Sequence, residues 1–214
     1  MINKIEKYLD EIIPNPKCEL NYKKDYELLI ATMLSAQTTD KKVNQVTEIL
    51  FEKYPNLEQL SSAKKEDIIE IIKPIGTYNK KAINTIEIAK SLKEVRRVPN
   101  DRAFLESLPG VGRKTTNVVL SNIYNVPCIA VDTHVERVSK RLGLVPNKSD
   151  VRKVEEILTK KIEKEKLGRL HHQLVLFGRY YCKSQNPQCY NCKLKDICKY
   201  KKKEYRRIHE KRIY

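Results

Sequence analysis

The sequence predicts an all-α fold, and three observations carry this prediction. Apolar residues recur at three- and four-residue spacing along most of the chain, which is the period of an amphipathic helix. Strand-like alternation with hairpin turns is absent. Proline and glycine interrupt the periodic segments at short intervals, so the helices are expected to be closely connected.

The expected helices follow in chain order. An N-terminal helix comes first, and periodic segments then occupy residues 26–37, 42–54, 65–73 and 79–92. A short helix capped by Asn100 or Asp101 leads into Leu-Pro-Gly-Val-Gly, and a second helix begins near Arg113. The last periodic segments are residues 134–144, 150–164 and 170–181. With 214 residues, 40% of them hydrophobic, the chain can bury at least one core.

The charge of the chain indicates a polyanionic partner. Lys and Arg number 43 against 27 Asp and Glu, a formal net charge of +16, and nucleic acid is the obvious candidate. A membrane surface is the alternative, but no apolar run approaches the length of a bilayer span. The opening residues also lack the regions of a signal peptide. We therefore expect a cytoplasmic protein, associated with the nucleoid and without a membrane partner.

Four of the six cysteines lie close together near the end of the sequence. Cys182, Cys189, Cys192 and Cys198 have the spacing C-x6-C-x2-C-x5-C, which favours a metal or iron–sulfur site over a disulfide framework. Only one C-x2-C pair occurs, whereas a zinc ribbon has two. Spacing alone leaves zinc and an iron–sulfur cluster open. The isolated Cys18 and Cys128 are expected to be packing residues.

The segment LPGVGRKT at residues 108–115 predicts an anion site. Pro109 fixes one φ angle, while Gly110 and Gly112 can adopt positive φ and allow another backbone to come close. Together with the positive end of the following helix, their amides suit a DNA phosphate and carry no base specificity. The alternative is a simple helix–turn–helix corner. The expected DNA-contacting residues are Leu108, Gly110, Gly112, Arg113 and Thr115.

Lys114 and Asp132 are the candidate catalytic pair. Lys114 is expected in the first turn of a helix and half-buried in a cleft, where the helix end and desolvation favour the neutral amine that a nucleophile needs. Asp132 could accept the proton and stabilise positive charge on a sugar. Alternatively, Lys114 is a solvated helix residue, and Asp132 or Thr133 merely caps the next helix, with Thr133 and Glu136 forming a capping box.

LPGVGRKT followed by VDTH at 131–134 resembles the signature of a helix-hairpin-helix DNA glycosylase superfamily, and most closely its endonuclease III branch. The similar segments run through nearly the whole chain in the same order: residues 27–40, 72–82, 108–120, 130–144, 171–182 and the final cysteines. The resemblance implies a two-lobed fold. A helical barrel of residues 20–128 contains the helix-hairpin-helix at about 100–124, and residues 1–19 with 129–214 form a lobe that carries the cluster loop 182–198.

The resemblance also implies the activity. A lysine at the position of Lys114 attacks C1′ of a damaged, oxidised pyrimidine nucleotide, forms a Schiff base and breaks the strand by β-elimination, and Asp132 matches the catalytic aspartate. The four cysteines of the loop would bind a 4Fe-4S cluster. The expected protein is a monomeric DNA glycosylase and abasic-site lyase that binds duplex DNA. Two alternatives stay open: a monofunctional mismatch glycosylase, which Lys114 disfavours, and a non-catalytic DNA-binding module with structural zinc.

A base inside a duplex must be flipped out and the vacancy filled. In the family, the filling residues come from loops that match LSAQTTD and KPIGTYN, which points to Gln37 and to the Ile75–Thr77 turn. Thr77 departs from the usual bulky apolar residue, so Ile75, Thr77 and Tyr78 are all candidates. Lys183 in the cysteine loop is expected to contact phosphate. The basic residues 199–214 are either a solvated tail or a phosphate-contacting arm.

Overall fold

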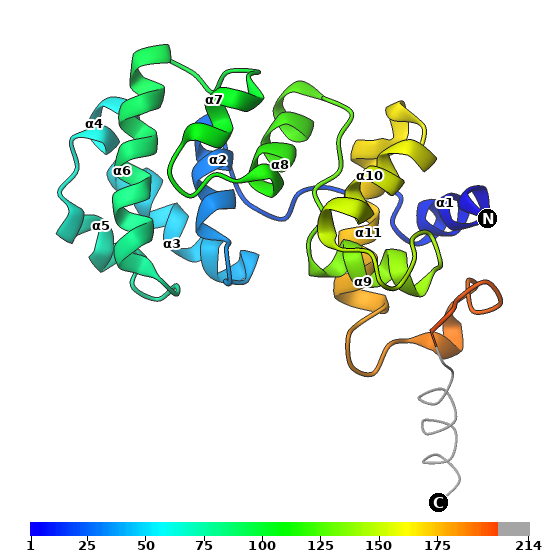
Figure 1. The fold of residues 1–214 in the computed structure, drawn as a ribbon. Helices are drawn as coiled ribbons and strands as arrows, with labels where there is room; N and C mark the ends of the chain where they lie inside the picture. Colours follow the sequence, from blue (N-terminus) through cyan, green and yellow to red (C-terminus); the bar gives the residue numbers. More distant parts are fainter. Residues whose placement is uncertain (201–214) are drawn as a thin grey trace, which may run out of the picture. The chain divides into compact units, whose positions relative to one another are not determined.

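The computed structural model describes residues 1–200, and within them the fold is entirely helical, as predicted (Figure 1). The end of the basic segment, residues 201–214, lies outside the described residues. The α-helices of the described part are α1 Ile2–Ile12, α2 Asp25–Leu34, α3 Asp40–Lys53, α4 Leu57–Ser61, α5 Lys65–Ile72, α6 Tyr78–Val95, α7 Arg102–Ser107, α8 Arg113–Tyr124, α9 Thr133–Arg141, α10 Val151–Lys161 and α11 Leu167–Leu176.

The chain forms two compact units. One is Cys18–Val126, and the other joins Met1–Lys17 to the chain from Pro127 onward. In the first unit α2 is the central helix: every residue from Tyr26 to Leu34 is buried, because most of its residues are apolar and only Glu27 and Thr32 among the buried ones are polar. Helices α3, α6 and α8 pack against it, and Figure 1 shows α2 between α6 and α8.

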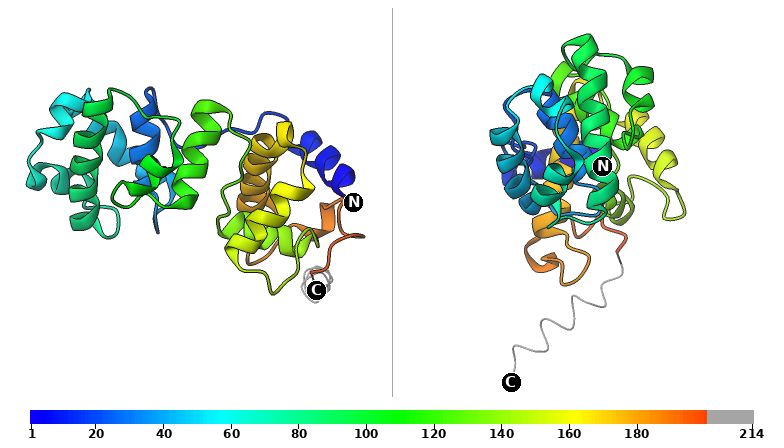
Figure 2. Two further views of the ribbon diagram at one scale, coloured as in Figure 1. Left: turned by 45° about the horizontal axis from the view of Figure 1, so that its top comes forward. Right: turned by 90° about the vertical axis from the view of Figure 1, so that its left-hand side faces the viewer.

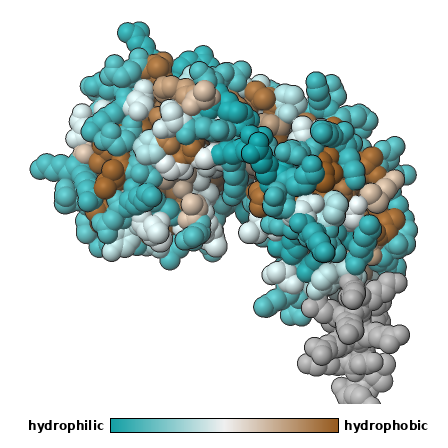
Figure 3. Space-filling view, viewed as in Figure 1, coloured by the Kyte–Doolittle hydropathy of each residue, from teal (hydrophilic) through white to brown (hydrophobic). Residues whose placement is uncertain are grey.

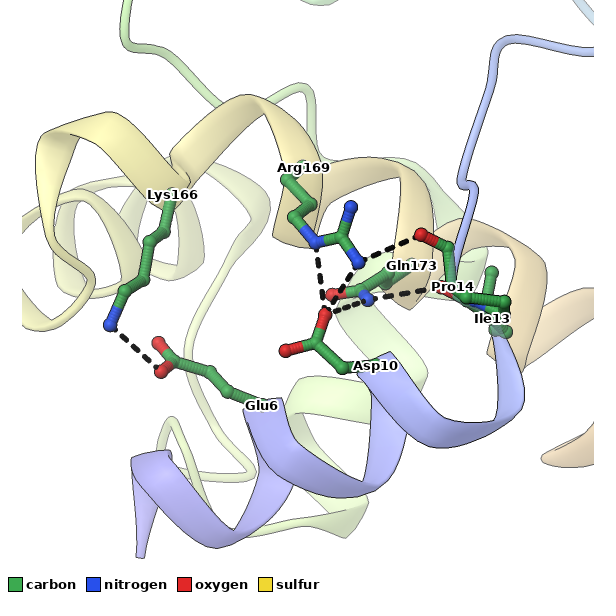
Figure 4. Close-up of polar contacts among 7 residues, drawn as sticks. All are labelled: Glu6, Asp10, Ile13, Pro14, Lys166, Arg169 and Gln173. Atoms are coloured by element: carbon green, nitrogen blue, oxygen red, sulfur yellow. Dashed lines mark hydrogen bonds and ion pairs between the residues drawn. The ribbon is translucent and has the colours of Figure 1, made fainter.

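The second unit is built from both ends of the sequence. Figure 2 shows the N-terminal helix α1 beside the late segments of the chain. Its apolar face, including Ile5 and Leu9, packs with residues of α9, α10 and α11 in one core. Its polar face is tied to α11, since Asp10 accepts hydrogen bonds from Arg169 and Gln173 (Figure 4).

Several elements differ from the sequence prediction: the expected helices 26–37 and 150–164 end early, at Leu34 and Lys161, and two further differences concern whole elements. Helix α4 was not expected, because its five residues are too few to display a helical period. The expected helix 170–181 is α-helical only to Leu176 and continues as a π-helix, Phe177–Tyr181. Its last bond runs from the Cys182 N–H to the Phe177 carbonyl, 2.7 Å away. Gly178 lies in this turn, where a Cβ atom would come within 2.8 Å of the His134 Cβ, so α9 packs closely against it.

The surface carries little continuous apolar area on the face drawn in Figure 3. Within residues 1–200, no helix combines the length and the apolar character that crossing a bilayer requires.

Candidate active site and metal centre

The helix-hairpin-helix forms where the proline and glycine pattern predicts it. Asp101 caps α7 by accepting a hydrogen bond from the Phe104 N–H at 3.1 Å. The hairpin then turns through a bond from the Val111 N–H to the Leu108 carbonyl at 3.1 Å, and α8 begins at Arg113 as expected. No side chain caps α8, so the amides at its start can receive an anion from outside the protein.

The two hairpin glycines have different conformations. Gly110 has φ +77°, and a Cβ there would lie 2.4 Å from Asn84 Nδ2 and 3.3 Å from Met33 Cγ. Gly112 has φ −102° and an extended backbone, with nothing within 4 Å of an added Cβ. Of the two glycines, only Gly110 has the positive φ that the sequence allowed for both. The close packing around Gly110 also leaves no room for a larger residue. Gly112 leaves open space in front of the helix end.

The remaining hairpin residues divide by exposure. Leu108 is buried, and its N–H and carbonyl are both used within the hairpin, so it anchors the turn. Arg113 is exposed and Thr115 is half-buried. Lys114 lies in the first turn of α8, as predicted, but it is exposed rather than half-buried. Its side chain is therefore open to solvent.

Asp132 lies in the second unit and is the N-cap of α9. Its Oδ1 accepts hydrogen bonds from the N–H groups of His134 at 2.9 Å and Val135 at 2.8 Å. Thr133 is the first residue of α9, not its cap. Asp132 therefore does cap the next helix, as the alternative interpretation of the sequence proposed. A carboxylate offers about four lone-pair positions on two oxygens, however, so capping does not exhaust it.

Arg137, one turn further along α9, connects this cap to the cysteine loop. Its Nη2 donates to the Gly178 carbonyl at 2.7 Å and lies 3.1 Å from His134 Nδ1, and its Nε donates to the Cys182 carbonyl at 3.2 Å. Burial lowers the pKa of His134, and the Asp132 carboxylate opposes that shift. A neutral imidazole can accept the bond from Arg137.

The four clustered cysteines line one cavity of about 490 Å³, walled partly by Tyr8, Phe177 and Tyr181. Among the described residues, no three His, Cys, Asp or Glu side chains converge closely enough to hold a single metal ion. Burial, reinforced by the other three cysteines, raises the pKa of the Cys189 thiol to about 11. Burial also raises the pKa of Cys192 and Cys198. Thiolates in this cavity therefore need a cationic partner.

Arg141 braces both ends of the cysteine loop. Its guanidinium donates to the carbonyls of Lys183 at 2.6 Å and Ser184 at 3.2 Å. Its own carbonyl accepts from the Cys198 thiol at 3.3 Å. Lys183 is exposed, and its backbone carbonyl is held in place by the hydrogen bond from Arg141. Arg137 and Arg141 were not singled out from the sequence. The one feature that could have indicated them is their spacing of four residues, which places two basic side chains on one face of a helix.

The two loops expected to fill a DNA vacancy lie in the first unit. Gln37 and Thr77 are exposed, and both have φ of 57°, a left-handed backbone uncommon outside glycine. Tyr78 is 38% exposed, whereas Ile75 is only 1% exposed. The Ile75 side chain is thus part of the core, and an expectation of direct contact with DNA fits Thr77 or Tyr78 better.

Cys18 is partly buried and Cys128 is buried, and neither forms a disulfide. Only Cys128 belongs to the buried core.

Known proteins resemble this chain over almost its full length. Residues 30–164 match the model of the HhH-GPD superfamily of base excision DNA repair proteins. Endonuclease III of Bacillus subtilis is 47% identical over 92% of this chain and 93% of its own length. Endonuclease III of Escherichia coli K12 is 45% identical over 91% of this chain and 93% of its own.

Solved structures agree with the sequence relatives. A trapped covalent intermediate of endonuclease III with DNA has a TM-score of 0.87 and 45% identity, covering 97% of this chain and 99% of that one. A non-covalent endonuclease III–DNA complex has a TM-score of 0.89 and 44% identity, covering 97% of each chain. A thermostable thymine-DNA glycosylase has a TM-score of 0.80 at 24% identity, covering 93% of this chain and 94% of that one, and shares the fold.

The fold and the hairpin thus define a helix-hairpin-helix base-excision repair protein. Within that superfamily the chain belongs to the endonuclease III family of DNA glycosylases and abasic-site lyases.

Proposed function

We propose that this protein excises oxidised pyrimidines from duplex DNA and then cleaves the abasic strand through a Schiff base on Lys114. The observation that carries the proposal is the position of Lys114. It is exposed in the first turn of α8, directly after a glycine hairpin whose helix end has no side-chain cap. A phosphate bound there would hold a nucleotide within reach of the amine.

The proposed reaction uses two groups of the protein. The neutral Lys114 amine attacks C1′, the C1′–N bond to the base breaks, and the base leaves with a proton. The amine loses one proton and the C1′–O4′ bond breaks as the C1′=N bond forms, so that the sugar ring opens and O4′ takes up a proton. Loss of a proton from C2′ then breaks the C3′–O bond and expels the 3′ phosphate by β-elimination. Asp132 would accept a proton and stabilise the positive charge on the sugar. Its second oxygen suits that role, since Oδ1 is the one that caps α9.

Two surfaces would hold the DNA. The hairpin residues Gly110, Gly112 and Arg113 suit the phosphate backbone, with Lys183 as a further contact. The loops that carry Gln37 and Thr77 are proposed to fill the space left by the flipped nucleotide. We propose that the unit Cys18–Val126 is the helical barrel and that the other unit is the cluster domain. The protein is proposed to be a monomer that acts on the nucleoid in the cytoplasm.

We propose that Cys182, Cys189, Cys192 and Cys198 bind a 4Fe-4S cluster. All four cysteines line one cavity, and their sequence contains one C-x2-C pair, whereas a zinc ribbon has two. When bound, the cluster would supply cationic iron to stabilise the thiolates and fix the loop. Iron and sulfide analysis of the anaerobically purified protein tests this, and a colourless, zinc-loaded protein would contradict it.

Borohydride trapping on abasic duplex tests the nucleophile. The wild-type protein is expected to form a covalent adduct, and Lys114→Ala to form none. Lys153→Ala is a matched control, because Lys153 is also an exposed lysine in the first turn of a helix. Undiminished trapping by Lys114→Ala would refute the assignment.

Strand scission separates the alternatives. Cleavage of abasic duplex without added metal supports the bifunctional enzyme. Release of a base without scission would support a monofunctional glycosylase, and neither activity would support a DNA-binding module.

A further inference from the structure

Lys81 is a charged side chain that the proposed chemistry does not use, yet it is only 4% exposed. It lies in the first turn of α6. Its Nζ donates to the Ala36 carbonyl at 2.8 Å and to the Thr38 hydroxyl at 3.3 Å, and both acceptors are neutral. Burial lowers the pKa of this lysine. Burying an ammonium group is costly, so its retention calls for a function.

The bonds of Lys81 reach both loops that are proposed to enter DNA. Its Nζ contacts the residues on either side of Gln37, which follows the end of α2. Its backbone N–H donates to the Thr77 carbonyl at 3.1 Å in the ordinary i to i−4 bond of α6, so the Lys81 side chain starts one helical turn from Thr77. Gln37 and Thr77 each have φ of 57°, a left-handed conformation that is unfavourable for residues with a side chain unless the surroundings hold it.

We infer that Lys81 is a positioning residue that holds the Gln37 loop and the Thr77 turn together for insertion into the duplex. The inference rests on the proposed role of these loops in filling the vacancy. It assigns the buried ammonium group to loop geometry, because two of its three donors bond atoms of the Gln37 loop inside the protein.

The test compares Lys81→Met with Lys80→Met. Methionine has a similar length and fills the buried space without a charge. Lys80 is the exposed neighbour on the same helix, so its substitution removes the same charge without touching the loops. Hydrogen exchange should rise at residues 35–38 and 75–78 in Lys81→Met alone, with α8 unchanged. Equal exchange in both variants would overturn the inference.

Activity gives the second readout. On duplex with an oxidised pyrimidine, kcat/KM of Lys81→Met should fall about 10- to 100-fold, as expected for a mispositioned group. Scission of single-stranded abasic DNA should stay within about twofold, because no duplex vacancy has to be filled. An equal loss on both substrates would overturn the inference.

A double-mutant cycle separates this inference from the proposed function. If Lys81 acts through Gln37, Lys81→Met should cost little extra in a Gln37→Ala background, and additive losses would count against it. If Gln37→Ala and Thr77→Ala leave duplex activity intact, the proposed role of the loops fails, while the exchange measurement still tests whether Lys81 holds them.

Discussion

Gly110 and Gly112 are two residues apart, and replacing each with alanine is predicted to change the free energy of unfolding by different amounts. Gly110→Ala should lower the free energy of unfolding by about 1–2 kcal/mol from the left-handed backbone alone, with a further cost for displacing Asn84. Gly112→Ala should cost about 1 kcal/mol or less, because its backbone is extended and its surroundings are open. Urea unfolding measures both changes.

The same pair tests the hairpin as a phosphate anchor. In Gly112→Ala the added methyl group would stand between the helix end and the phosphate, so affinity for abasic duplex should fall about tenfold or more. Wild-type affinity in this variant would mean that the backbone of the DNA does not approach Gly112.

A test of Asp132 has to separate its role as the N-cap of α9 from its proposed role in catalysis. Asparagine is as good an N-cap as aspartate, so Asp132→Asn should change the free energy of unfolding by about 1 kcal/mol or less, mostly through the lost charge at the helix end. Base release should nevertheless fall about 10²- to 10⁴-fold. Retained activity with Asn would leave Asp132 as a cap only.

Among the elements, α1 is held to α11 by a contact that depends on pH. Hydrogen bonding from Arg169, followed by that from Gln173, lowers the pKa of the Asp10 carboxyl (Figure 4). Because the folded pKa is the lower one, the stabilisation is present above the ordinary pKa of about 3.9 and is lost as pH falls through the folded value. Half-exposed pairs of this kind contribute about 0.2–1 kcal/mol.

Asp10→Asn should therefore be less stable than the wild type at pH 7 and pH 5, and the difference should close at lower pH. Denaturant unfolding of both proteins at each pH measures it, and contributions common to the two cancel. Glu70→Gln, in an exposed pair with Lys73, is the control and should show a smaller difference. A gap that persists unchanged below pH 3 would contradict the assignment.

The elements also mark where sequence reasoning reaches its limit. The sequence pattern predicted a helix beginning near Arg113 and a cap at Asn100 or Asp101, and the structure has α8 beginning at Arg113 and Asp101 capping α7. Such features can be predicted because caps and turns depend on neighbouring residues. The π-helical turn at Phe177–Tyr181 could not be predicted, since it depends on α9 packing against Gly178. The burial of Lys81 and Ile75 is likewise set by contacts between segments distant in sequence.

At the scale of the whole molecule, the net charge of +16 predicts a strong dependence of DNA affinity on salt. Each phosphate contact adds about −0.9 to the slope of log affinity against log salt for duplex DNA. Both units carry groups proposed to bind DNA. A protein making about 6–10 such contacts should lose about 10³- to 10⁵-fold in affinity between 50 and 200 mM salt.

Truncating the chain after Tyr200 measures how much the basic tail contributes to the salt dependence of DNA affinity. This cut removes seven Lys and Arg but keeps the Tyr200 ring, whose centroid lies 3.8 Å from the guanidinium carbon of Arg141. If the tail is a phosphate-contacting arm, the truncated protein should have a slope shallower by several contacts, measured with undamaged duplex across a salt series. Scission of abasic duplex at low salt should persist, because Lys114 and the cysteine loop are intact. An unchanged slope would assign the phosphate contacts to the two folded units alone.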